Sequence, residues 1–396
     1  MMQIKVSSFK SRLQHSLHFD EETSRFLNEI KQKGELELEF ADLADYDCDL
    51  KLIFIETGGS EGLFLQHFSL LQEPYYLLTS GGNNSLAASL EILTYLNHQQ
   101  KKGEILHGTP EYIARRIKEL AGVQKALKTL KTSTLGVIGK PSDWLIASVP
   151  DYSAVEALFG LRLKDIPLSE LEKKLKQKHF TSVHPDLNKK WSKEELSKAS
   201  GIYDGLKELV LEHRLNGLTL RCFDLLTSVR STGCLGLAYL NKEGIIGTCE
   251  GDIMAMISMY IVRLLTGQSS FQANPSLIDP VQNQITFAHC TIPLDMVTSF
   301  NLDTHFESGI GVAIKGELLE QKITVFRISA DLKHYYVSSG TILKNLNEKN
   351  LCRTQITVAM DQDVTELLRH PCGNHHILFY GDHQALLEEL MKQVLK

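Results

Sequence analysis

The sequence predicts an α/β protein with two Rossmann-like (flavodoxin-like) parallel-sheet domains, followed by a mostly β C-terminal domain. Short apolar segments alternate with longer segments of helical spacing through the first two thirds of the chain, as in βαβ units. Several of the strand-like segments run directly into turns that contain glycine. From about residue 268 onward the helical spacing stops and short alternating segments follow. We therefore expect three domains, over residues 1–132, 133–266 and 267–396.

Length and composition exclude several classes of protein. The chain has 396 residues, of which 43% are hydrophobic and 23% charged, which is ordinary for a globular protein of two or three domains. The net charge of −6 means that the chain has no excess of basic residues for binding nucleic acid. No apolar segment is long enough to cross a membrane. Seven scattered cysteines without a C-x-x-C pair are typical of reduced thiols. We expect a cytoplasmic protein without nucleic-acid or membrane partners.

The elements of the first domain follow from its apolar spacing. Runs rich in strand formers predict strands at 36–40, 52–55, 75–78 and 105–106. Leucine and isoleucine at helical spacing predict helices around 86–96 and 113–123. Glycine-rich turns follow two of the strands, at 58–60 and 81–85. Ligands bind beyond the carboxyl ends of strands in open α/β sheets, although most such glycines serve the turn alone.

The second domain contains the most informative segment of the chain. A strand-like run at 135–138 opens it, charged helices are expected at 169–178 and 193–214, and a strand at 218–223. A further strand at 245–249 then leads into Glu250-Gly251-Asp252 and an apolar helical stripe over 253–265. Asp252 stands where an N-cap belongs, and Gly267 stands where a C-terminal glycine belongs.

Glu250 is the first candidate for chemistry. It lies between the end of a predicted strand and the start of a predicted helix, where catalytic residues lie in α/β domains. The alternative is that Glu250 and Asp252 only cap the helix and interact with its dipole. Position alone leaves both interpretations open.

Histidines in the C-terminal domain could complete a site. Strands are expected at 284–288, 323–328 and 352–359, and His289 ends the first of them. One carboxylate and two imidazoles suit a divalent transition metal such as Mn²⁺. The candidates are tens of residues apart, so their spacing carries no signal. His375 and His376 would point to opposite faces of a strand, so only one of them could be a ligand.

Eight short motifs resemble one family. The chain resembles the L-fucose/L-arabinose isomerase superfamily, in particular its compact "fucose isomerase-like" branch. The motifs run in family order from the second domain to the C-terminus: GVIGKPSDWLIAS (136–148), CEGD (249–252), AHC (288–290), HFESG (305–309), CRTQ (352–355) and GNHH (373–376). GGNNS (81–85) and LHG (106–108) extend the match into the first domain.

The resemblance implies an activity and a metal site. Members of this family convert an aldose to a ketose through a cis-enediol, with Mn²⁺ or a similar cation. By resemblance, the first glutamate ligand and proton-transfer residue is Glu250, and the histidine ligands are His289 and His375, with His376 as the alternate. The second acidic ligand of the family falls on Asn274, which is a departure.

The missing carboxylate and the substrate contacts have further candidates. Asp252 and Glu307 are the candidates for the second acid or base. The expected substrate-binding residues are Gly82, Asn83, Asn84, Lys140, Trp144 and Arg353. The family also implies a homo-oligomer in which subunits share the active site, with the 81–85 turn as the contributor from the neighbouring subunit.

Three hypotheses about function stay open at this stage. The first is a metal-dependent isomerase of neutral sugars. The second is an isomerase of an anionic sugar, such as a sulfonated or acidic one, which the basic residues Lys140, Arg230 and Arg353 near the motifs favour. The third is a non-catalytic sugar-binding or regulatory protein, which Asn274 in a ligand position favours.

Overall fold

The computed structural model describes residues 2–11, 19–177 and 191–395. The chain divides into two compact units, Met1–Leu127 (unit 1) and Lys128–Lys396 (unit 2), each of which is described by itself. Within the described ranges, no helix has both the length and the apolar character needed to cross a bilayer.

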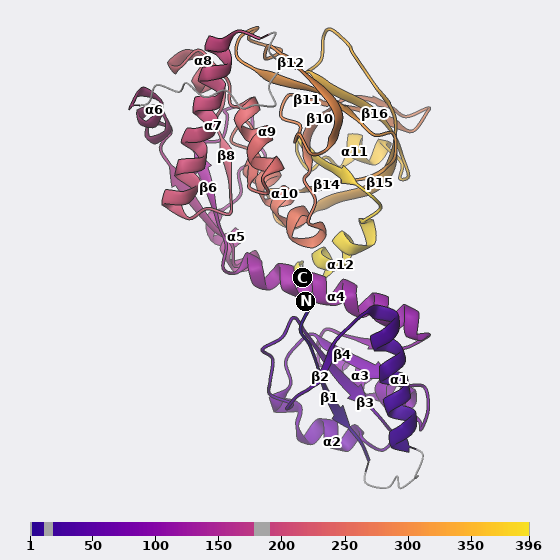
Figure 1. Ribbon diagram of the computed structural model, residues 1–396. Coiled ribbons are helices and arrows are strands. Elements are labelled where there is room, and N and C mark those ends of the chain that lie inside the picture. The colour runs from indigo at the N-terminus through magenta and orange to yellow at the C-terminus, as the bar shows by residue number, and fades with distance from the viewer. Residues whose placement is uncertain (1, 12–18, 178–190, 396) are drawn as a thin grey trace. The chain divides into compact units, whose positions relative to one another are not determined.

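Unit 1 is a parallel sheet with helices. Its strands are ordered β2-β1-β3-β4-β5 and every neighbouring pair is parallel, which is the flavodoxin-like order. The elements are β1 (Ile4–Phe9), α1 (Phe19–Gly34), β2 (Leu38–Phe40), β3 (Leu50–Ile55), α2 (Glu61–Gln66), the 3₁₀ turn η1 (Phe68–Leu70), β4 (Tyr75–Thr79), α3 (Ser85–His98), β5 (Gly103–Leu106) and α4 (Pro110–Leu130), which continues into unit 2. The four predicted strands and two predicted helices are confirmed, whereas β1, α1, α2 and η1 were not predicted (Figure 1).

The first part of unit 2 is a second parallel sheet, in the order β7-β6-β8-β9. Its elements are β6 (Thr134–Ile138), α5 (Tyr152–Phe159), β7 (Arg162–Ile166), α6 (Leu168–Gln177), α7 (Lys193–His213), β8 (Gly217–Leu220), α8 (Asp224–Ser228), α9 (Cys234–Lys242), β9 (Ile246–Thr248) and α10 (Ile253–Thr266). The last residue of the helix predicted at 169–178 lies outside the described residues. The strand order reverses between β6 and β8, which makes the loops after these strands the expected ligand side.

The second part of unit 2 is mostly β, as predicted. Six antiparallel strands close into a barrel in the order β10-β11-β16-β15-β14-β17, and β12 and β13 form a separate hairpin. The elements are β10 (Phe271–Asp279), β11 (Gln284–His289), β12 (Val297–Asp303), β13 (Ala313–Leu318), β14 (Lys322–Ile328), β15 (Tyr335–Asn345), β16 (Thr354–Met360), α11 (Thr365–Arg369), β17 (His376–Tyr380) and α12 (Gln384–Val394).

Helix α10 joins the sheet and the barrel. Its predicted ends are confirmed, because the Asp252 carboxylate accepts a hydrogen bond from the Ala255 amide at 2.8 Å and Gly267 has a φ of +70°. The helix packs against β8 and β9 of the sheet and against β14 and β17 of the barrel. One apolar core runs from the strands of the sheet to those of the barrel. The predicted division at 266/267 falls inside unit 2, and a division into separate domains there stays a prediction.

Candidate active site

Glu250 occupies a strained turn at the carboxyl end of β9. Its φ of +64° is unusual for a residue with a side chain, and Gly251 follows with a φ of +71°. A side chain at position 251 would meet the Lys140 carbonyl oxygen at 2.7 Å, so only glycine fits there. The Ser142 amide donates to the Glu250 carbonyl at 3.0 Å. The loop after β6 thus holds the turn that presents the Glu250 side chain.

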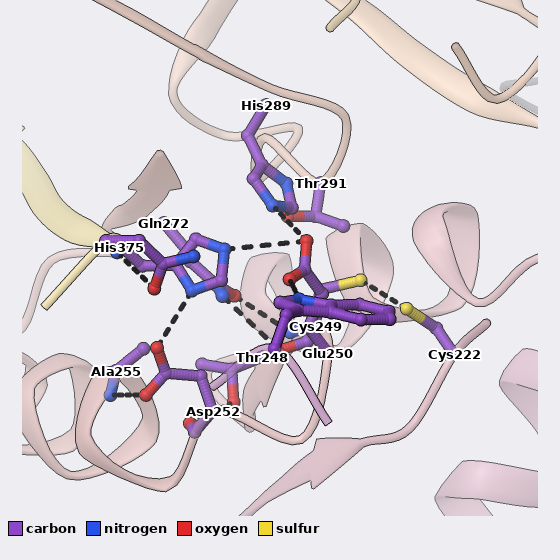
Figure 2. Close-up of polar contacts among 12 residues, drawn as sticks. Cys222, Thr248, Cys249, Glu250, Asp252, Ala255, Gln272, His289, Thr291 and His375 are labelled. Atoms are coloured by element: carbon purple, nitrogen blue, oxygen red, sulfur yellow. Dashed lines mark hydrogen bonds and ion pairs between the residues drawn. The ribbon is translucent and has the colours of Figure 1, made fainter. Parts of the chain in front are cut away.

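Two imidazoles from the barrel converge on Glu250. The Nε2 atoms of His289 and His375 each lie 3.5 Å from Oε1 of Glu250. The two rings are 5.2 Å apart and nearly perpendicular. Figure 2 shows both rings directed at the same carboxylate oxygen. His289 comes from the end of β11 and His375 from the residue before β17, so the barrel brings together residues that are far apart in sequence.

The other polar atom of each of these side chains is fixed by a neighbour. Nδ1 of His375 lies 2.8 Å from Oδ2 of Asp252, and Nδ1 of His289 lies 3.1 Å from the Thr291 hydroxyl. The Trp144 indole donates to Oε2 of Glu250 at 2.7 Å. The three side chains that face one another are therefore each oriented from behind, as metal ligands are.

The shared environment shifts the pKa values of all three groups. Burial opposes ionisation of Glu250, but the two imidazoles outweigh it and hold the pKa of Glu250 well below its usual range. For His375, burial is outweighed by the Asp252 and Glu250 carboxylates, which raise its pKa to about 9. Burial and the nearby His375 lower the pKa of His289. These surroundings therefore favour the ionised carboxylate of Glu250 and the protonated imidazole of His375 opposite it.

The donor set fits a divalent transition metal ion. One carboxylate oxygen and two imidazole nitrogens lie within 4.8 Å of one another. Their 3.5 Å separations are longer than ordinary hydrogen bonds, yet ligand atoms about 2.1 Å from one cation stand roughly 3.0–3.5 Å apart. Nε2 of His375 is buried and has no hydrogen-bond partner among the residues that the structure describes. Glu250, His289 and His375 could therefore hold a metal ion.

His376 points elsewhere, as the predicted alternation requires. Its ring lies against Phe287 and Tyr336 of the barrel strands, 6.3 and 5.5 Å away between centroids. Burial lowers the pKa of His376 to about 3, so it is a neutral ring at ordinary pH. Of the two adjacent histidines, His375 is the one beside Glu250.

Asp252 is engaged from several sides. It is fully buried, and Nη1 of Arg327 lies 3.1 and 3.0 Å from its two oxygens. Together with the Ala255 amide and His375, this occupies both carboxylate oxygens with donors. Burial raises the pKa of Asp252, but Arg327 and His375 lower it more, to about 2. The geometry of Asp252 is better suited to orienting His375 than to contacting a substrate.

A row of aromatic rings borders the centre. Trp144 is half exposed and meets Phe223 edge to face at 4.9 Å, and Phe223 meets His305 in the same way at 5.2 Å. These rings come from the loop after β6, the loop after β8 and the loop after β12. Burial and the nearby His289 lower the pKa of His305 to about 4. The row therefore runs from the half-exposed Trp144, which binds Glu250, to the buried His305.

Three further predicted residues differ in how far their side chains are bound by neighbours. Lys140 is exposed, and no hydrogen bond or ion pair is recorded for its side chain among residues 2–11, 19–177 and 191–395. Arg353 donates to the Thr304 carbonyl at 2.7 Å and to its hydroxyl at 3.0 Å. Glu307 is exposed, and partial burial together with the charge of Glu250 raises its pKa. Of the two cations, Lys140 is the more available to a ligand.

The remaining predicted residues lie on other elements. Asn274 is in β10, two positions after Gln272, whose side-chain oxygen accepts from the Cys249 amide at 2.8 Å. Strand alternation places Asn274 and Gln272 on the same face of β10, the face toward the Glu250 turn. Gly82, Asn83 and Asn84 lie in unit 1, in the turn between β4 and α3, where both asparagines have positive φ. The predicted site residues are thus divided between the two units.

Sequence reasoning missed the residues that support the site from behind. Phe223, Gln272, Thr291 and Arg327 were not predicted as site residues, and His305 was singled out only within the HFESG motif. For Arg327 a signal was present, because a single arginine interrupts the apolar end of β14, Val-Phe-Arg-Ile. For His305 the signal was its position in the HFESG motif.

The fold and the site define a class: two parallel sheets and a barrel, with a carboxylate and two imidazoles where the second sheet meets the barrel. No family model matches the chain. The chain is 24% identical over 327 residues to a protein named sulfoquinovose isomerase from Priestia aryabhattai, which covers 78% of this chain and 73% of that protein.

Two other relatives carry the same name. The sulfoquinovose isomerase of Alkalicoccus urumqiensis is 23% identical over 337 residues, covering 78% of this chain and 74% of that protein. The one from Clostridium sp. (strain MSTE9) is 27% identical over 194 residues, covering 46% of this chain and 43% of that protein. Most of the chain is therefore similar to proteins named as sugar isomerases.

Proposed function

We propose that this protein is an aldose–ketose isomerase that acts on an anionic, sulfonated sugar through a cis-enediol. The observation that carries the proposal is the convergence of His289 and His375 on the carboxylate of Glu250. The names of the relatives support the sulfonated substrate class among the hypotheses left open by the sequence.

Glu250 is the proton-transfer residue in this proposal. Isomerisation moves a proton between two adjacent sugar carbons, so it needs a base above one face of the substrate. The carboxylate of Glu250 is ionised, and Trp144 holds its Oε2 in a fixed direction. Glu307 is the proposed second acid or base, because it belongs to the HFESG motif and lies close enough to Glu250 for that charge, with partial burial, to raise its pKa.

The proposed metal site consists of Glu250, His289 and His375, with the Asn274 side-chain oxygen as a fourth donor. A divalent cation such as Mn²⁺ would supply positive charge that stabilises the negative charge developing on the sugar oxygens. The imidazoles of His289 and His375 hold their Nε2 atoms toward this position, because Thr291 and Asp252 bind their Nδ1 atoms.

The anionic group of the substrate needs a positive partner, and Lys140 is the proposed one. It follows β6 at the reversal point of the strand order, and its backbone touches the Glu250 turn. Arg353 already donates to Thr304 and lies 3.5 Å from a carboxylate oxygen of Asp303. Trp144, half exposed four positions further along the same loop, is the proposed contact for the apolar face of the sugar ring.

Subunit association is part of the proposal. The turn with Gly82, Asn83 and Asn84 would reach the active site of a neighbouring subunit, with the asparagine side chains as hydrogen-bond partners for sugar hydroxyls. Light scattering at the assay concentration tests this. A stable monomer that retains full activity would contradict the shared site.

One assay tests the function. The pure protein is incubated with sulfoquinovose, glucose, fucose and arabinose, each with Mn²⁺ and with a chelator, and ketose formation is followed by NMR. We expect turnover of sulfoquinovose with Mn²⁺ and its loss in the chelator. Turnover of neutral sugars alone would favour the neutral-sugar hypothesis. Binding of sulfoquinovose without turnover under either condition would favour the non-catalytic one.

A further inference from the structure

Arg327 is a fully buried cation that the proposed chemistry does not use. Its side chain comes from β14 of the barrel and has 0% of its surface exposed. Nη1 donates to both oxygens of Asp252, Nη2 donates to the Ser148 hydroxyl at 3.0 Å, and Nε donates to the Cys372 carbonyl at 3.3 Å. All three nitrogens of the guanidinium therefore have partners.

These partners come from three separate segments. Ser148 belongs to the loop after β6, Asp252 is the N-cap of α10, and Cys372 lies in the segment that leads into β17. A side chain at Gly373, where φ is +126°, would meet Nη2 of Arg327 at 2.8 Å. The chain therefore passes directly over the guanidinium two residues before it reaches His375.

Burying such a pair is expensive. Removing two charges from water costs several kcal/mol per ion, and apolar residues of similar size are often as stable in such places. Stability alone therefore does not explain why Arg327 and Asp252 form a buried ion pair. The contact between Asp252 and His375 supplies a reason, since Oδ2 of Asp252 accepts from Arg327 and also faces Nδ1 of His375 at 2.8 Å.

We propose that Arg327 is a positioning residue of the active site: it holds the Asp252 carboxylate against Nδ1 of His375 and thereby directs Nε2 of His375 at Glu250. This inference rests on the proposed function, because it concerns the orientation of a proposed metal ligand. The planar guanidinium meets three differently placed acceptors at once, which the single ammonium of a lysine does less well. Arg327 itself is shielded from the substrate by these partners.

A purely structural role is the competing explanation, and one neighbouring residue separates the two. The Ser258 hydroxyl of α10 accepts from the Ile328 amide at 3.2 Å, and Ser258 is fully buried. Ser258→Ala therefore loosens the same helix–strand packing without touching Asp252 or His375. It is the matched control for the loss of Arg327.

The test uses Arg327→Met, Arg327→Lys and Ser258→Ala in the full chain. Mn²⁺ affinity is measured by calorimetry, and the low-field proton resonance of His375 Nδ1 is measured by NMR and assigned by its loss in His375→Gln. We expect Arg327→Met to weaken Mn²⁺ binding about 10–100-fold, the usual effect of losing a partner behind a ligand, and to abolish the resonance. Arg327→Lys should recover part of both, and Ser258→Ala should keep both while lowering the melting temperature.

Other outcomes remain decisive. A folded Arg327→Met protein with wild-type affinity and an unchanged resonance would overturn the proposal. If Arg327→Met does not fold, Ser148→Ala is used; it should shift the resonance and weaken Mn²⁺ binding, and the absence of both effects would overturn the proposal. If the wild type binds no Mn²⁺, the proposed metal site fails, and the resonance alone then decides whether Arg327 positions His375.

Discussion

The indole Nε1 of Trp144 donates a 2.7 Å hydrogen bond to Oε2 of Glu250, across 106 positions of sequence. Trp144 is half exposed in the loop after β6, whereas only 12% of the Glu250 side chain is exposed. The bond therefore joins a surface loop to the most strained residue of the site. It also leaves Oε1 as the oxygen that faces the two histidines.

Glu250→Gln should lower turnover at least about 100-fold while leaving the fold intact, because glutamine has the same shape but cannot accept the proton. The measurement is the rate of ketose formation, with circular dichroism as the check on folding. Glu307→Gln is the companion variant and should cause a smaller loss. A near wild-type rate in Glu250→Gln would show that Glu250 serves the turn and does not transfer the proton.

Trp144→Phe should lower kcat about tenfold, which corresponds to about 1.4 kcal/mol and lies near the lower limit for a hydrogen bond to a charged group. Phenylalanine keeps an aromatic edge for Phe223 but has no donor for Glu250. Ile146→Ala is the control, because Ile146 is 92% exposed in the same loop. Equal rates in the wild type and Trp144→Phe would show that the hydrogen bond does not orient the base.

Lys140→Met should raise KM for sulfoquinovose about tenfold and leave kcat nearly unchanged, since it removes a binding charge away from the reacting carbons. Lys164→Met, an exposed lysine in β7 of the same sheet, controls for the change in net charge. An effect of the same size in both variants would point to general electrostatics. In that case the sulfonate has another partner.

The two adjacent histidines should behave differently. His375→Gln should weaken Mn²⁺ binding by more than about 100-fold, because it removes a ligand and not merely a partner behind one. It should also abolish the rise in melting temperature that Mn²⁺ produces by binding the folded state. His376→Leu should retain both, since Nε2 of His376 is buried without a partner in the barrel. Loss of Mn²⁺ binding in His376→Leu but not in His375→Gln would mean that His376 is the ligand and His375 is not.

Asn274→Asp should tighten Mn²⁺ binding, because a carboxylate attracts a hard divalent ion more strongly than an amide oxygen does. Turnover need not rise, since the added negative charge also makes the cation a weaker electrophile. Titration calorimetry of the metal-free proteins measures the difference. Equal affinities would place residue 274 beyond the reach of the metal.

Local signals in the sequence predicted the elements that carry the site, but not the packing that assembles it. The N-cap Asp252 and the terminal Gly267 fixed the ends of α10, because both act through bonds within a few residues. The approach of His289 and His375 to Glu250 depends on the closure of six strands, and no spacing in the sequence encodes that closure. The motifs pointed to these histidines only through resemblance.

Arg327 also shows that the sequence does not reveal which distant residues come together. A lone arginine in an apolar strand is visible in the sequence, but its partners lie 45, 75 and 179 positions away. Strand β1 was not predicted because polar residues interrupt its short apolar run, Ile-Lys-Val-Ser-Ser-Phe. Helix α1 was missed because its apolar residues are few among charged ones.

The division of the site between a sheet and a barrel has a consequence for folding kinetics. Glu250 arrives with the sheet and α10, whereas His289 and His375 arrive with the barrel. Before the two parts dock, the sheet offers only the carboxylate and the barrel only the two imidazoles, so neither half holds all three donors. The proposed metal site is therefore complete only after the sheet and the barrel have docked. During refolding, capture of Mn²⁺ would report the last step of assembly, later than the secondary structure and later than either half alone.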